Sequence, residues 1–171
     1  MPVPAHARRE AFVMRDRADG RSINVLGNEV TIRIASRDSG GAFTVFEGQT
    51  QPLQGPPLHL HRDQDECWYI LEGDYKFEVD GQEIYAGAGA TVFAPRGRRH
   101  TFQNVGTTPG RIITTVVPGG LDVFFEELEA AAPHGTVPDP AKLIPIFDRH
   151  GLELLGPPLA ARTVITPAGA D

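Results

Sequence analysis

The chain has 171 residues, which is enough for one domain that buries its own core without disulfides. Its single cysteine, Cys67, excludes an intramolecular disulfide, and the formal net charge of −6 disfavours nucleic acid or an anionic membrane as a partner. No apolar run approaches the length that spans a bilayer, and the first ten residues lack the apolar segment of a signal peptide. We therefore expect a soluble, cytoplasmic protein.

Residues 1–22 are polar and contain Arg8, Arg9, Arg15, Arg17 and Arg21. Runs of like charge are usually solvated. We expect an N-terminal arm that is either loose or laid as an edge strand on a partner subunit.

Residues 23–120 show short apolar runs separated by turn signals. In 75–79, for example, apolar and polar residues alternate, and Asp80-Gly81 follows as a strong hairpin signal. Such a pattern predicts an all-β fold, either a closed barrel or a two-sheet sandwich. The strands expected are 23–26, 29–36, 42–48, 58–61, 66–71, 75–79, 82–85, 90–94, 100–105 and 111–117.

The pattern changes after Gly120. Apolar residues at helical spacing predict a helix over 121–132, which either packs on the barrel or acts as a lid. A second, short helix is expected over 141–150, ended by Gly156-Pro157-Pro158, and the tail carries little structural signal. Residues 121–171 are thus expected as a C-terminal helical extension packed on a barrel formed by 23–120.

Three histidines and one glutamate stand out as candidate metal ligands. His59 and His61 are one residue apart, so on a strand both rings point to the same face. Glu66 follows at short range, and His100 returns after a Pro-x-Gly turn. Brought together inside a barrel, these side chains would bind one divalent first-row transition metal ion. Each of them taken singly has a plainer interpretation as an ordinary polar side chain.

The region around these residues resembles the cupin family. Its first motif is matched by His59, His61, Glu66 and Gly73, with the spacing His-x-His, four residues, Glu, six residues, Gly. The second motif is matched in every named position, which are Gly89, Pro95, Gly97, His100 and Asn104.

One position departs from this pattern. The glycine expected six residues before His59 is replaced by Leu53, and Gly55 lies two residues later. Asp65 fits a shorter spacing and competes with Glu66 as the ligand. Glu66 is preferred because it has the same strand parity as Trp68.

The resemblance implies a double-stranded β-helix, that is, a cupin or jelly-roll barrel with short C-terminal helices here, and a homodimer. Similar proteins hold Fe, Mn, Ni, Co, Cu or Zn on three His and one Glu. The Gly-Pro-Pro-x-His-x-His entry resembles quercetinase-like monocupins, in which the equivalent Glu is thought to deprotonate a substrate hydroxyl. By that resemblance Glu66 would be both a ligand and a base.

Strand parity also suggests the wall of a pocket for a flat, apolar small molecule. The alternative for each aromatic residue is a place in the barrel core. The candidate substrate-binding residues are Phe46, Trp68, Phe77, Phe93 and Phe102.

Three functions remain open at this point. The first is a metal-dependent dioxygenase acting on a hydroxylated aromatic or enolic molecule. The second is a metal-assisted isomerase or cyclase that needs no dioxygen, and the third is a small-molecule-binding cupin with little turnover. The complete ligand set favours an enzyme.

Overall fold

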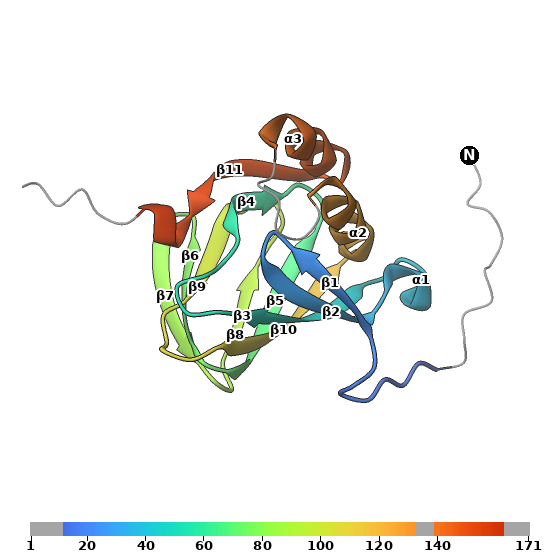
Figure 1. The fold of residues 1–171 in the computed structure, drawn as a ribbon, viewed down its shortest axis with the longest axis horizontal. Helices are drawn as coiled ribbons and strands as arrows, with labels where there is room; N and C mark the ends of the chain where they lie inside the picture. Colours follow the sequence, from blue (N-terminus) through green and yellow to red (C-terminus); the bar gives the residue numbers. More distant parts are fainter. Residues whose placement is uncertain (1–11, 133–138, 163–171) are drawn as a thin grey trace, which may run out of the picture.

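The computed structural model describes residues 12–132 and 139–162, which form two antiparallel sheets that face each other (Figure 1). This is the predicted all-β jelly-roll architecture. The first sheet runs in the spatial order β1 (Arg21–Val25), β2 (Asn28–Ile34), β3 (Thr44–Thr50), β10 (Gly110–Val117), β5 (Asp65–Glu72) and β8 (Thr91–Ala94). The second runs β11 (Leu152–Pro158), β4 (Pro57–His61), β9 (His100–Asn104), β6 (Asp74–Val79) and β7 (Gln82–Gly87).

Alternation along the strands sets the inward face of the barrel. On β5, Trp68 and Ile70 are buried while Tyr69 is exposed, because successive side chains point to opposite faces. Together with Tyr75 and Phe77 of β6, they belong to a core cluster inside the barrel. The polar ligand candidates of β4, β5 and β9 therefore lie against an apolar interior.

Four helical segments accompany the sheets: α1 (Ser36–Ser39), α2 (Leu121–Ala131), α3 (Pro140–Arg149) and the 3-10 turn η1 (Leu159–Arg162). The helices α2 and α3 contact each other, and they cover the barrel beside β1 and β11 (Figure 1). Their apolar faces join a second core cluster with the first strands, in which Phe124 and Phe147 meet edge to face at 4.9 Å. The apolar spacing of 121–132 correctly predicts this helix.

Buried Asp122 fixes the start of α2. Its carboxylate accepts hydrogen bonds from the backbone and hydroxyl of Ser36 and from the hydroxyl of Thr44, so one side chain ties α2 to α1 and β3. α1 is a single helical turn, and it is followed by left-handed Gly40 and Gly41.

The strand β11 is absent from the sequence prediction. Residues 152–158 pair antiparallel with β4, with Leu152 opposite His61 and Leu154 opposite His59. Pro157 and Pro158 suggested a break, but β11 is an edge strand, where a missing backbone N–H is tolerated. No helix in the described part of the chain is long and apolar enough to cross a membrane.

Candidate metal centre

Four side chains from three strands converge inside the barrel. His59 and His61 come from β4, Glu66 from β5 and His100 from the first position of β9, directly opposite His59 in the β4–β9 pair. One ligand atom from each lies within 4.8 Å of all the others. His61, Glu66 and His100 are buried, whereas His59 is half-buried because its ring borders a cavity.

Each histidine is oriented by its Nδ1 atom, which faces away from the cluster. Nδ1 of His59 lies 2.8 Å from the carbonyl oxygen of Pro57, and Nδ1 of His100 lies 2.9 Å from that of Arg98. Nδ1 of His61 lies 3.0 Å from Oε1 of Gln64. Because these oxygens only accept hydrogen bonds, each Nδ1 carries a proton, and the opposite Nε2 is the atom left to bind a metal.

The carboxylate of Glu66 completes the cluster. Its Oε2 lies 3.2 Å from Nε2 of His61 and 3.1 Å from Nε2 of His100. Burial would raise the pKa of Glu66, but His100 and His61, which donate to its carboxylate when Nε2 carries a proton, hold it well below its usual range. The carboxyl group is therefore an anion among the imidazoles, as a cation site requires.

The pKa values of His59 and His61 shift in opposite directions in this environment. Burial, reinforced by the rings of His100 and His61, lowers the pKa of His59 to about 3. Burial would also lower the pKa of His61, but its hydrogen bonds to Glu66 and Gln64 outweigh burial and raise it. In the absence of a cation, a proton shared between His61 and Glu66 thus offsets the negative charge of the buried Glu66 carboxylate.

Donor type, burial and orientation all fit a divalent transition metal. Three imidazole nitrogens and one carboxylate oxygen leave coordination positions open toward the cavity, unlike a closed structural zinc site. Asp65, the competing ligand, instead forms a salt bridge with Arg96 at 2.8 Å. Strand parity separates the two carboxylates, since Glu66 is buried and Asp65 points to the other face.

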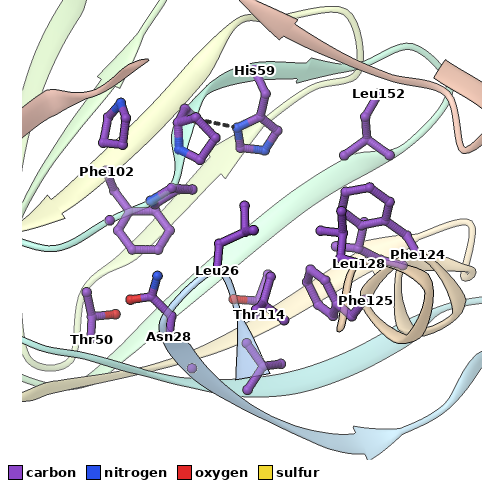
Figure 2. Close-up of a pocket in the computed structure, with 18 of the residues that line it drawn as sticks. Leu26, Asn28, Thr50, His59, Phe102, Thr114, Phe124, Phe125, Leu128 and Leu152 are labelled. Carbon is purple, nitrogen blue, oxygen red and sulfur yellow. Dashed lines mark hydrogen bonds between the residues drawn. The ribbon is translucent and has the colours of Figure 1, made fainter. Parts of the chain in front are cut away.

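The site opens into a cavity of about 650 Å³ (Figure 2). Phe46, Trp68 and Phe102 line it, as expected from parity. Phe77 does not line it, because it is fully buried in the core behind the ring of Trp68, at a centroid distance of 5.3 Å.

The prediction for Phe93 is wrong. Its side chain is 57% exposed and lies outside the cavity, because Val92 and Ala94 are the inward residues of β8. In the sheet, Phe93 is opposite Cys67, which alternates with Glu66 along β5 and so faces away from the metal ligands. In this four-residue strand Thr91 is exposed and has the same parity as Phe93, so the polar residue of β8 marks the outward face to which Phe93 belongs.

Much of the cavity wall comes from elements that the sequence did not assign to the site. Phe124 and Leu128 of α2 and Leu152 of β11 line it, and so do Leu26 and Asn28 of the first hairpin (Figure 2). The amphipathic pattern of 121–132 showed an apolar face on α2, but not that this face borders the cavity.

Comparison with known proteins agrees with this fold. Residues 46–117 match the family model described as "Cupin domain". The chain is 29% identical over 90 residues to the tetracenomycin polyketide synthase protein TcmJ of Streptomyces glaucescens, covering 52% of this chain and 60% of that protein. It is 25% identical over 112 residues to the polyketide synthase CurC of Streptomyces cyaneus, covering 64% of this chain and 71% of CurC.

A third relative is the quercetin 2,3-dioxygenase of Bacillus subtilis, 27% identical over 94 residues, or 55% of this chain and 28% of that enzyme. The chain thus spans less than two thirds of the length of TcmJ and of this dioxygenase. Among solved structures, the predicted oxalate decarboxylase of Thermotoga maritima is similar in fold, with a TM-score of 0.56 and 23% identity over 63% of this chain and 99% of that chain. The polyketide cyclase RemF of Streptomyces resistomycificus has a TM-score of 0.54 and 21% identity over 62% of this chain and 79% of its own.

Proposed function

We propose, from the match of residues 46–117 to the cupin domain family, that the protein is a metal-dependent oxygenase acting on a hydroxylated aromatic or enolic small molecule. One observation supports this most. The four convergent ligand candidates lie at the wall of a large cavity lined by aromatic and aliphatic side chains. Such a cavity accepts a flat apolar molecule and places one of its oxygen atoms at the cluster.

In this proposal the metal ligands are His59, His61, Glu66 and His100. A bound redox-active divalent ion would act as a Lewis acid toward a substrate hydroxyl and would allow reaction with dioxygen. The chain itself orients the imidazoles through their Nδ1 hydrogen bonds, and it excludes water by surrounding the substrate with Phe46, Trp68 and Phe102.

The identity of the reaction is tested by oxygen consumption. Metal-loaded protein mixed with quercetin should consume dioxygen, and His61→Ala should lose both bound metal and oxygen uptake because it removes a buried ligand. His150→Ala is the matched control, since His150 lies outside the cluster beside Glu127 and Phe124. Equal metal content in His61→Ala and wild type, measured by elemental analysis, would contradict the metal site.

Glu66 is proposed to accept the substrate proton as well as to bind the metal. Glu66→Gln keeps the size of the side chain and one oxygen atom that can bind a metal. The amide cannot accept the substrate proton as a carboxylate does. Turnover at equal metal loading should fall by about a hundredfold or more, the usual contribution of a positioned general base. Unchanged turnover at equal loading would remove the base role and leave the ligand role intact.

A cyclase that does not use dioxygen is the second candidate. We keep this candidate because the relatives TcmJ and CurC are named as polyketide synthase proteins and not as oxygenases. Both candidates use an enolic or phenolic substrate and the same metal site. Product formed from such a substrate under anaerobic conditions would favour the cyclase over the oxygenase. A homodimer stays a prediction, for light scattering to test.

A further inference from the structure

The cavity contains polar groups on the side that lies away from the metal ligands. In Figure 2, Thr114 and Asn28 are seen across the pocket from His59. Both residues line the cavity, and the side chain of neither makes a hydrogen bond to another described residue. Thr114 is only 3% exposed, so its hydroxyl group lies in the protein interior and faces the cavity.

Thr114 occupies the middle of the sheet. It lies on β10 between Phe46 of β3 and Trp68 of β5, which are its direct neighbours in the two strand pairs. Its hydroxyl is therefore held between two aromatic residues of the cavity wall. Because this hydroxyl borders the cavity and has no hydrogen-bond partner among the described residues, a ligand with a matching oxygen can form a hydrogen bond with it.

Asn28 is held by the tight turn of the first hairpin. Val25 and Asn28 form the last pair of β1 and β2, and the two residues between them have positive φ, 51° at Leu26 and 92° at Gly27. The side chain of Asn24 closes the turn by accepting the backbone N–H of Gly27 at 3.1 Å. A two-residue turn of this kind fixes the register, so Asn28 faces the cavity in a defined position.

We infer that Thr114 and Asn28 form a hydrogen-bonding subsite that selects substrates carrying a second oxygen function, a hydroxyl or carbonyl, remote from the oxygen at the metal. This inference rests on the proposed function. A few polar groups in an apolar pocket set the orientation and specificity of its ligand. The substrate class is thus a flat apolar body with oxygen functions at two separate positions, and not one with a single enolic group.

The test compares two probes with the metal-loaded protein. Quercetin has further ring hydroxyls, whereas 3-hydroxyflavone has only the 3-hydroxyl and the adjacent carbonyl. Binding is followed by quenching of Trp68, the single tryptophan of the chain, and the dissociation constant is taken from the midpoint of the titration. The variants are Thr114→Val, which removes only the hydroxyl, Thr114→Ser, which keeps it, and Asn28→Leu.

The wild type should bind quercetin more tightly than 3-hydroxyflavone. Thr114→Val should raise the dissociation constant of quercetin about fivefold to tenfold, the effect of one lost hydrogen bond, and change that of 3-hydroxyflavone less than about twofold. Thr114→Ser should keep the preference. Thr115→Val, on the same strand but facing outward, is the matched control and should change neither value.

If Thr114→Val raises the dissociation constants of both probes equally, or changes neither, the subsite is overturned. The proposed function stays in place in both cases. If Thr114→Val does not fold, Asn28→Leu must show the selective loss of quercetin binding, and failure to do so overturns the subsite. If the wild type binds neither probe, the proposed substrate class falls, and the subsite falls with it.

Discussion

At the level of single residues, the three candidate imidazole ligands differ in what holds them. Pro57 and Arg98 offer backbone carbonyls to His59 and His100, which no substitution of those side chains would remove. His61 depends on a side chain, Gln64, whose Nε2 in turn donates to the carbonyl of Pro118 at 3.1 Å. Of the three groups that accept a hydrogen bond from a ligand histidine, only the Gln64 side chain can be removed by mutation.

Gln64→Leu should weaken metal binding without removing a ligand. The Nδ1 proton of His61 would lose its acceptor, and loss of such a partner typically costs about tenfold to hundredfold in metal affinity. Competition with a chelator of known affinity measures the change. Gln82→Leu, an exposed position at the start of β7, is the matched control, and equal affinities in the two variants would show that Gln64 does not position His61.

At the level of elements, the loop before β4 determines how closely two ligands approach each other. Leu53 has a φ of 64°, so the position where the cupin motif has glycine is left-handed here although the side chain is leucine. Its backbone N–H donates to the carbonyl of Asn104 at 2.8 Å, which anchors the loop to β9. Gly55 lies so close to β9 that a Cβ atom would stand 1.8 Å from the carbonyl oxygen of Phe102.

Gly55→Ala should therefore push β4 away from β9 and separate His59 from His100. We expect a loss of about 1–3 kcal/mol in the free energy of unfolding, as for other overpacked sites, together with weaker metal binding. Gly48→Ala is the control, because a Cβ there would meet nothing within 4 Å. Chemical denaturation and metal titration of both variants check this, and equal stabilities would contradict the close approach.

The same elements show how far sequence reasoning reaches. The period of two in β4 and the motif spacings are local, and they correctly predict that His59 and His61 share a face and that the barrel is of cupin type. The pairing of β11 with β4 and the contribution of α2 to the cavity depend on contacts between distant segments. No local pattern encodes those contacts, whereas the outward placement of Phe93 follows from its parity with Thr91, the polar residue of β8.

At the level of the whole molecule, the cavity lies where the barrel and the C-terminal elements meet. Its wall combines barrel residues such as Phe46 and Trp68 with Phe124 of α2 and Leu152 of β11. Phe124 and Leu152 are also members of the core cluster that joins α2 and α3 to the first strands. Ligand binding in this cavity is therefore expected to raise the stability of the whole fold, because the ligand binds only the folded state, in which these segments meet.

The pKa values of His59 and His61 make the stability of the metal-stripped protein depend on pH. The pKa of His59 is about 3 in the fold, against an ordinary value of 6.5 for a histidine side chain. Between these values the unfolded chain binds a proton that the folded protein does not, so His59 lowers the free energy of unfolding as the pH falls from 6.5 toward 3. His61 acts with the opposite sign, since its raised pKa gives stability that is present below 6.5 and lost as the pH rises through the folded value.

A difference measurement separates the two histidines. The free energy of unfolding of metal-stripped wild type minus that of His59→Gln should decrease between pH 6.5 and pH 4, because only the wild type has the proton-binding penalty at position 59. The slope should approach, and not exceed, about 1.4 kcal/mol per pH unit, the value for one proton. His150→Gln, which lies outside the cluster, serves as the control. If this difference in unfolding free energy does not change over the range, the ring of His59 takes up its proton freely in the folded protein. The ring would then lie in contact with bulk solvent and not against His61 and His100.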